Sequence, residues 1–157
     1  MSSDNCFVWN VRGLNGRDRR NVVRDLVSQE RATLVCLQET KLSTICNPLA
    51  NEILGSMFDY DYLPSLNVAG GILLGWHRDH WVVSDVDKSR FSLSAKVARA
   101  AVPQECWWIT VVCGPLADQD KLRVKLFKIQ HTMRVVLMTR THEVVRIKAL
   151  LNFFIQI

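Results

Sequence analysis

The sequence has no apolar stretch long enough to span a bilayer, and its first residues, MSSDNC, do not resemble a signal peptide. Its five cysteines are an odd number, and no two of them have the Cys-x-x-Cys spacing of zinc and redox sites. The hydrophobic share of 48% and the charged share of 22% are ordinary for a globular protein. The sequence therefore predicts a soluble intracellular domain without disulfides, structural zinc or a membrane segment.

The C-terminal part of the chain lacks a different set of residues. Residues 121–157 contain no glycine, proline or aspartate, whereas residues 1–120 hold all 7 glycines and all 4 prolines. Residues 1–120 carry 12 Lys and Arg against 14 Asp and Glu, while residues 121–157 carry 8 against the single Glu143. The net charge of +5 thus belongs to this tail, and a composition break lies near Lys121.

The N-terminal residues predict a strand, a helix and a second strand. Residues 6–11 alternate between two faces, which is typical of a strand, and the apolar residues of 17–30 recur at helical spacing. The run ATLVCLQ is short and continuously apolar, as expected of a strand that is covered on both faces. The spacing predicts a right-handed βαβ unit with two parallel strands whose carboxyl ends meet at one edge.

The rest of the chain predicts one short helix and further strands. A helix is expected around residues 48–54, and GGILLGW is expected to form a strand. The segments HWVVSDV, FSLSAKVA and CWWITVVCG follow it with the spacing of an antiparallel meander. The apolar spacing of residues 121–133 favours a helix, and no turn signal follows it. The fold class predicted from these patterns is α/β, an N-terminal βαβ unit plus antiparallel strands.

Polar residues end both strands of the βαβ unit. Asn10 closes the first strand, and Glu39 follows the second. Ligands of open α/β sheets bind at the carboxyl ends of the strands, where a carboxylate can bind Mg²⁺ and an amide can bind a phosphate oxygen. The alternative is that Asn10 satisfies a backbone group at a strand end and that Glu39 is a solvated charge.

Four ordered motifs give the chain a family resemblance. WNVRGLN, LQETK, GGILLGW and WWITVVCGP, over about residues 5–122, resemble the first half of the endonuclease/exonuclease/phosphatase superfamily. The resemblance is closest to the endonuclease domains of plant LINE-type non-LTR retrotransposons. It implies a partial four-layered α/β sandwich, Mg²⁺-dependent hydrolysis of phosphodiesters in DNA, and a nuclear location if that role is retained. It implies no obligate protein partner.

The resemblance also implies roles for five residues. Glu39 matches the metal-binding glutamate, Asn10 matches the asparagine at the metal and phosphate site, and Lys41 follows the glutamate as in many members. Arg12 stands where many DNA-repair relatives carry an aspartate, although arginine is common in the plant group. Cys113 replaces the tyrosine of the family motif VYGP and supplies no phenol near the phosphate.

The second half of the family pattern does not occur in the sequence. The Gly-Asp-x-Asn motif is absent, and so is the Ser-Asp-His motif or its equivalent near the end of the domain. General acid–base groups contribute about 10²- to 10⁴-fold to such reactions. The resemblance therefore implies an incomplete, inactive hydrolase with a divergent basic and apolar tail at 123–157, produced by a frameshift or altered splicing. A chain with only the first of the family's two sheets would also leave an apolar sheet face open.

Alternative functions remain open at this point. The chain could be an active phosphodiesterase that a partner completes. It could also be a non-enzymatic nucleic-acid binder that grips phosphates through Arg123, Lys125, Lys128 and Arg134 of the tail, with affinity falling steeply between about 50 and 200 mM salt. His77 to His80, HRDH, is expected to form a polar turn rather than a metal cluster.

Overall fold

The computed structural model describes residues 5–67, 70–113, 123–129, 132–138 and 144–148, the last three segments through their backbone. The described elements are helices α1 (Arg17–Gln29) and α2 (Asn47–Leu54), with strands β1 (Asn5–Asn10), β2 (Leu34–Gln38), β3 (Phe58–Leu63), β4 (Ile72–His77), β5 (Trp81–Lys88), β6 (Ser92–Arg99), β7 (Val102–Val112), β8 (Arg123–Ile129), β9 (Thr132–Met138) and β10 (Val144–Lys148). Neither helix is long and apolar enough to cross a membrane.

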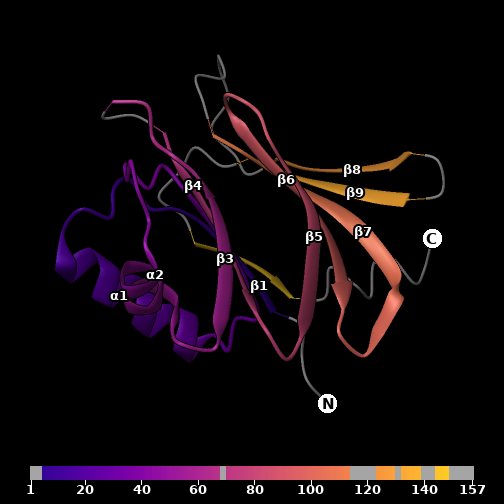
Figure 1. Ribbon diagram of the computed structural model, residues 1–157, viewed down its shortest axis with the longest axis horizontal. Helices are drawn as coiled ribbons and strands as arrows, with labels where there is room; N and C mark the ends of the chain where they lie inside the picture. The colour runs from indigo at the N-terminus through magenta and orange to yellow at the C-terminus, as the bar shows by residue number, and fades with distance from the viewer. Residues whose placement is uncertain (1–4, 68–69, 114–122, 130–131, 139–143, 149–157) are drawn as a thin grey trace.

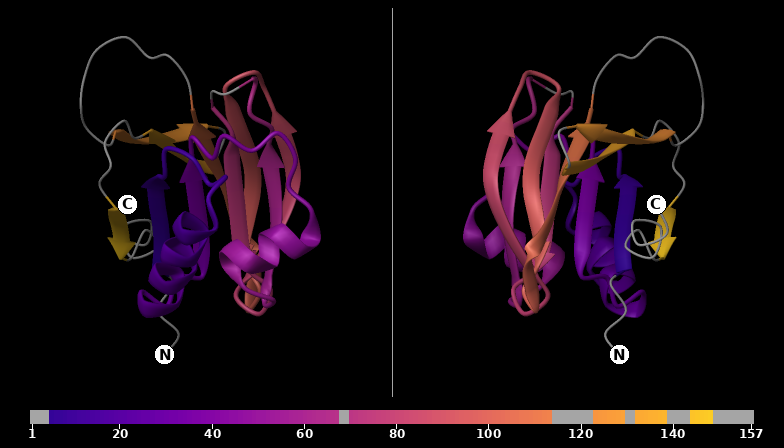
Figure 2. Two further views of the ribbon diagram at one scale, coloured as in Figure 1. Left: turned by 90° about the vertical axis from the view of Figure 1, so that its left-hand side faces the viewer. Right: turned by 90° about the vertical axis from the view of Figure 1, so that its right-hand side faces the viewer.

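The first sheet contains the predicted βαβ unit. Its strand order is β10-β1-β2-β4-β3, and β1 runs parallel to β2 with α1 connecting them. The βαβ prediction is therefore confirmed. β10 pairs antiparallel with β1, and Figure 2 shows β10, in yellow, beside β1, in indigo.

The predicted three-stranded meander is confirmed. β5, β6 and β7 pair antiparallel in a second sheet of order β5-β6-β7-β9-β8. The predicted strand in GGILLGW is β4, which lies between β2 and β3 in the first sheet. β4 is buried from Ile72 to Gly75 because strands flank it and other layers cover both its faces. The sequence analysis missed β3, the segment FDYDYL, whose alternating tyrosines and aspartates suit an edge strand.

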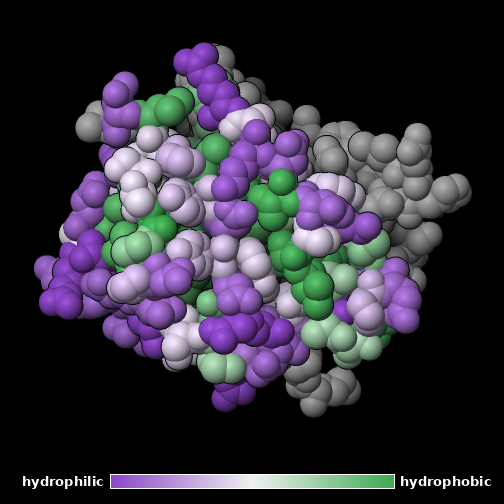
Figure 3. Space-filling view, viewed as in Figure 1, coloured by the Kyte–Doolittle hydropathy of each residue, from purple (hydrophilic) through white to green (hydrophobic). Residues whose placement is uncertain are grey.

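Two apolar clusters hold three layers together. One lies between the two sheets and includes Val8 and Leu74 from the first sheet and Ile109 from the second. The other lies between the first sheet and the helices and includes Phe7 and Ile53. Figure 1 shows both helices on the side of the first sheet that faces away from β5, β6 and β7, and the helical side of the molecule, at the left of Figure 3, has a largely hydrophilic surface.

The second sheet corrects one sequence expectation. The first sheet's inner face is not left open, because β5, β6 and β7 cover it. The physical reason is the alternation in β6, where Leu93, Ala95 and Val97 are all fully buried at 0% exposure. Residues 81–112 therefore supply the core strands of a second sheet. The family resemblance implies that this sheet belongs to the second half of the family pattern, which the sequence does not contain.

The tail also differs from the expectation. Residues 123–129 and 132–138 are strands rather than part of a helix, while 121 and 122 lie outside the described residues. β9 pairs parallel with β7, and β8 pairs antiparallel with β9. The valine-rich composition of 132–138 favours a strand, and the edge of β7 offers it a ladder of hydrogen-bonding groups.

Candidate functional site

The ends of β1 and β2 meet at one edge of the first sheet. Asn10 and Gln38 are register partners, and the pairing continues beyond the strands. The backbone N–H of Gly13 donates to the carbonyl of Glu39 at 2.8 Å, and that of Leu14 donates to the carbonyl of Thr40 at 2.8 Å. The structure therefore places Asn10 and Glu39 on adjacent segments at the carboxyl edge.

The backbone of this edge is strained. Arg12, Glu39 and Lys41 have positive φ angles of 49°, 52° and 56°. Such angles are uncommon for residues other than glycine, and they persist only where the surroundings fix them. Strained residues of this kind cluster at functional sites, which makes the Glu39 loop the prime candidate in the described part of the chain.

The glycine pair Gly70–Gly71 fixes the other side of the Glu39 loop. The N–H of Thr40 donates to the carbonyl of Gly71 at 3.2 Å, and the N–H of Lys41 donates to that of Gly70 at 2.9 Å. A Cβ added at Gly71 would lie 2.3 Å from the Thr40 hydroxyl oxygen, and Gly71 has a φ of 94°. Only glycine fits this position, so the pair serves close packing against the loop.

Gln38 joins the two sheets directly beside Glu39. Its side-chain Nε2 donates to the carbonyl of Val112, at the end of β7, at 2.7 Å, and the side chain is 1% exposed. Cys113 follows Val112 and is 7% exposed. Burial raises the pKa of the Cys113 thiol, the Glu39 carboxylate raises it further, and the backbone N–H of Glu39 opposes both effects. Cys113 therefore lies next to Glu39 as a neutral thiol.

Asn10, Arg12 and Lys41 lie beside Glu39 with different degrees of exposure. Asn10 is 2% exposed, and its side-chain oxygen accepts the backbone N–H of Arg12 at 3.3 Å, the local turn that asparagine commonly forms. Arg12 is exposed and Lys41 is half-buried. Asn10 therefore satisfies a backbone group at the strand end, which is the alternative that the sequence left open. If Asn10 also binds a ligand, it must do so while its oxygen accepts this hydrogen bond.

The side chains at this edge offer the oxygen atoms that Mg²⁺ prefers, but only a few of them. Mg²⁺ prefers oxygen ligands and is often held by one or two carboxylates with several waters. Glu39 supplies one part-exposed carboxylate and Asn10 one amide oxygen. No group of three or more His, Cys, Asp or Glu that could hold a metal gathers within the described residues. Among the described residues, Glu39 is the carboxylate at this edge to which an ion would attach.

The HRDH segment lies at the opposite edge of the sheet. β4 runs antiparallel to β2, with Trp76 opposite Leu34, so His77 and the turn after it lie beside the start of β2. The rings of His77 and His80 are 4.8 Å apart in an edge-to-face contact, and burial lowers the pKa of His77. The predicted polar turn is confirmed, and its Asp79–His80 pair is too far along the sheet to act on a group held at Glu39.

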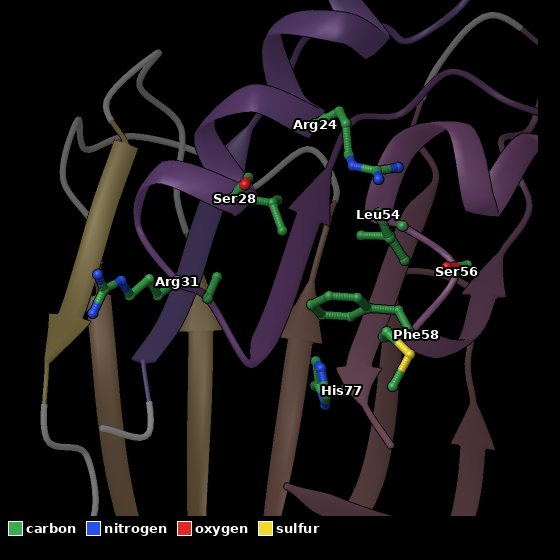
Figure 4. A pocket seen from close by; sticks show the side chains of 11 residues that line it. Arg24, Ser28, Arg31, Leu54, Ser56, Phe58 and His77 are labelled. Carbon is green, nitrogen blue, oxygen red and sulfur yellow. The ribbon is translucent and has the colours of Figure 1, made fainter. Parts of the chain in front are cut away.

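A cavity that the sequence did not indicate lies at that same opposite edge. It has a volume of about 250 Å³ and is formed by the end of α1, the α2–β3 connection and His77. Figure 4 shows Arg24 and Phe58 bordering it, while the guanidinium of Arg31 extends away. Three separate segments form this cavity, so no local sequence pattern could have revealed it.

Solved structures of known proteins share the fold. No protein-family model and no curated protein sequence matches the chain at a significant level. The human Nocturnin catalytic domain with bound sulfate matches over 69% of this chain and 48% of its own length, with a TM-score of 0.54 at 12% identity. An endonuclease/exonuclease/phosphatase from Bacteroides vulgatus matches over 70% and 52%, with a TM-score of 0.53 at 15% identity.

A third structure, of D. rerio TDP2 complexed with a single-strand DNA product, matches over 71% of this chain and 46% of its own length, with a TM-score of 0.50 at 14% identity. The chain thus spans about half the length of these structures. Its fold is of the endonuclease/exonuclease/phosphatase type, as the sequence predicted, and at these identities the likeness concerns the fold alone.

Proposed function

We propose that this chain is a remnant of a Mg²⁺-dependent phosphodiester hydrolase that keeps part of the phosphate and metal site and no longer turns over substrate. The observation that carries the proposal is the strained Glu39 loop, which the loop after β1 and the glycine pair hold from both sides at the carboxyl edge. This is the edge at which α/β sheets bind ligands.

Each residue of the edge has a proposed part. Glu39 would hold Mg²⁺, and the ion would supply the positive charge that stabilises the transition state at the phosphate. Lys41 lies two residues after Glu39, and Arg12 precedes Gly13, whose N–H donates to the Glu39 carbonyl; both residues are cationic and would attract the phosphodiester. Asn10 would orient a phosphate oxygen through its amide.

The proposed loss of turnover rests on groups that are absent from the described part of this edge and on motifs that are absent from the sequence. Hydrolysis needs a base for the attacking water and assistance to the leaving oxygen. Cys113 stands in the position that the family resemblance gives to a tyrosine, and a neutral buried thiol is a weak hydrogen-bond donor. The sequence has no Gly-Asp-x-Asn motif, and its Asp79–His80 pair lies at the wrong edge.

The finer assignment is to retrotransposon endonucleases. We propose DNA as the ancestral substrate, the nucleus as the place of action, and plant LINE-type elements as the closest relatives. The four sequence motifs support this, and one structural neighbour is complexed with a single-strand DNA product. We further propose that 5–122 derive from the first half of the hydrolase domain and that 123–157 have a separate origin.

Plasmid nicking tests the loss of turnover. Supercoiled plasmid incubated with the folded chain and Mg²⁺ is expected to nick no faster than with the variant Glu39→Gln. Glu105→Gln is the matched control, because Glu105 is an exposed glutamate at the opposite end of β7. Nicking that Glu39→Gln abolishes and Glu105→Gln retains would establish an active enzyme and contradict the proposed loss.

Metal binding tests the retained half of the site separately. Mg²⁺ stabilises a protein that binds it in the folded state only, so Tm should rise with Mg²⁺ concentration in the parent chain and in Glu105→Gln. The rise should vanish in Glu39→Gln. An equal rise in all three proteins would mean that Glu39 is not the ligand.

A further inference from the structure

The cavity beside His77 has no part in the proposed hydrolase site. It lies at the edge of the first sheet opposite Glu39, where the end of α1, the α2–β3 connection and the end of β4 meet. Its volume of about 250 Å³ is somewhat below the range of sites for drug-sized molecules. The cavity therefore has room for one small organic molecule.

Backbone hydrogen bonds hold the walls of the cavity in place. The N–H of Ala32 donates to the carbonyl of Val27 at 3.0 Å, which fixes the chain where it leaves α1. The N–H of Arg78 donates to the carbonyl of Met57 at 3.1 Å, which joins the end of β4 to the α2–β3 connection. The cavity thus needs no ligand to form, as is usual for small-molecule sites.

One side of the cavity is apolar and aromatic. The rings of Phe58 and His77 meet edge to face with their centroids 5.5 Å apart. Burial lowers the pKa of His77, so this ring is neutral at pH 7. Three buried aliphatic side chains also line the cavity: Val27, Ala32 and Leu54.

Arg24 gives the cavity a cationic group without a carboxylate partner among the described residues. Its Nη1 donates to the carbonyl of Asn51 at 2.7 Å, which leaves Nε and Nη2. These two nitrogens form the edge of a guanidinium that binds a carboxylate through two parallel hydrogen bonds. The described residues that line the cavity include no Asp or Glu, so an anionic ligand meets no repulsion from them.

We propose that this cavity binds a small aromatic carboxylate. The carboxylate would pair with Arg24, and the ring would pack against Phe58 and Leu54, because aromatic rings attract one another in edge-to-face and offset arrangements. The small volume and the apolar side favour a flat ring with one compact anionic group. The site is separate from the Glu39 edge, and its occupancy does not depend on Mg²⁺ there.

Titration of the full chain with cinnamate, followed by amide NMR in EDTA, tests the proposal. Saturable shifts are expected at the end of α1 and in residues 54–58, with a Kd on the order of 0.1 to 1 mM for so small a ligand. Cinnamyl alcohol, which has the same shape and no charge, should bind about tenfold more weakly. Equal affinity for the two compounds, or shifts confined to other parts of the chain, would overturn the proposal.

Two arginines that line the cavity form a matched pair. Arg24→Gln should raise the Kd for cinnamate about tenfold and leave the Kd for cinnamyl alcohol unchanged, a difference that general loss of folding would not produce. Arg31→Gln is the control, because the guanidinium of Arg31 extends away from the cavity (Figure 4). Equal effects of the two substitutions on cinnamate binding would contradict the role of Arg24.

A blocking variant provides an independent readout. Ser28 is an exposed residue of α1 that lines the cavity, so Ser28→Trp should fill the opening and abolish the cinnamate shifts. Gln29→Trp places the same side chain at the next exposed position, which does not line the cavity, and should bind cinnamate like the parent chain. Undiminished binding by Ser28→Trp would mean that cinnamate binds elsewhere. Because every titration is made in EDTA, its result is independent of the proposed hydrolase origin.

Discussion

At the scale of single residues, the Glu39 loop is tightly constrained. Its backbone groups bond to the loop after β1 on one side and to Gly70 and Gly71 on the other. Positive φ angles in residues other than glycine cost on the order of 1 to 3 kcal/mol each, so packing elsewhere must offset them. Substitutions at this loop should therefore affect stability and ligand binding together.

Gly71→Ala should strongly destabilise the protein. Its Cβ would lie 2.3 Å from the Thr40 hydroxyl oxygen and 3.3 Å from the backbone nitrogen of Lys41, in a left-handed conformation that alanine disfavours. We expect a loss of about 2 to 4 kcal/mol in the free energy of unfolding, measured by urea titration. Gly16→Ala is the control, since a Cβ there meets nothing within 4 Å. Equal stabilities of the two variants would contradict the close packing.

The thiol of Cys113 should make stability depend on alkaline pH. Burial raises its folded-state pKa above the ordinary value of 9.0, so the folded state holds the proton more tightly than the unfolded state. This contribution is complete below about pH 9 and is lost as the pH rises toward and through the folded-state pKa. The free energy of unfolding should therefore fall less above pH 9 in Cys113→Ala than in the parent chain. Parallel pH profiles would contradict this.

At the scale of elements, two side-chain hydrogen bonds link the sheets at their opposite ends. Gln38 reaches from β2 to the carbonyl of Val112 near the candidate site. Trp81 in β5 donates its indole N–H to the Thr33 hydroxyl at 3.1 Å at the other end, and both residues are buried. Apolar contacts are non-directional, so these two bonds help to fix how the sheets align.

Thr33→Val should test the link at the far end. The substitution keeps the shape and leaves the buried Trp81 N–H without its acceptor, which costs about 1 to 3 kcal/mol. Thr33→Ser keeps the hydroxyl and should lose less. Chemical denaturation of the three proteins measures the difference, and a Thr33→Val variant as stable as Thr33→Ser would show that the bond contributes little.

At the scale of the whole molecule, the tail strands extend both sheets. β9 pairs with β7 over five register positions, from Trp108↔Arg134 to Val112↔Met138, and β10 pairs with β1 over five, from Asn5↔Lys148 to Trp9↔Val144. Strands without partners at a sheet edge are open to pairing with other chains. Although its composition differs from the rest, the tail thus has a structural part in the fold.

Deleting residues 123–157 should destabilise the protein and promote aggregation. The edges of β1 and β7 would be exposed, and both strands carry buried apolar residues. Thermal unfolding and sedimentation of the shortened chain provide the measurement. A monomer with the Tm of the parent chain would mean that β8, β9 and β10 add nothing to stability.

The encoding DNA tests the separate origin of residues 123–157. Translation of the other frames downstream of the Lys121 codon is expected to reveal a Gly-Asp-x-Asn motif, because a frameshift would leave the original codons in place. If the motif appears neither there nor in downstream exons, the proposed break in the frame is wrong.

By itself, the sequence determined the βαβ unit and the polar ends of its strands, because apolar periodicity and the residues that interrupt it are local properties. Residues 6–11, 17–30 and 34–38 could therefore be assigned without a structure. It did not reveal that β4 joins the first sheet, that β3 exists, or that 123–138 are strands, because strand pairing depends on partners distant in the chain.

Only the tertiary structure decided how the candidate site is held and which faces are covered. The Gln38–Val112 bond joins residues 74 positions apart, and the place of Trp108 on an outer sheet face depends on which side of β7 meets the first sheet. Such contacts depend on how the two sheets pack against each other. Alternation along a strand shows which side chains share a face, but it does not show which of the two faces meets the other sheet.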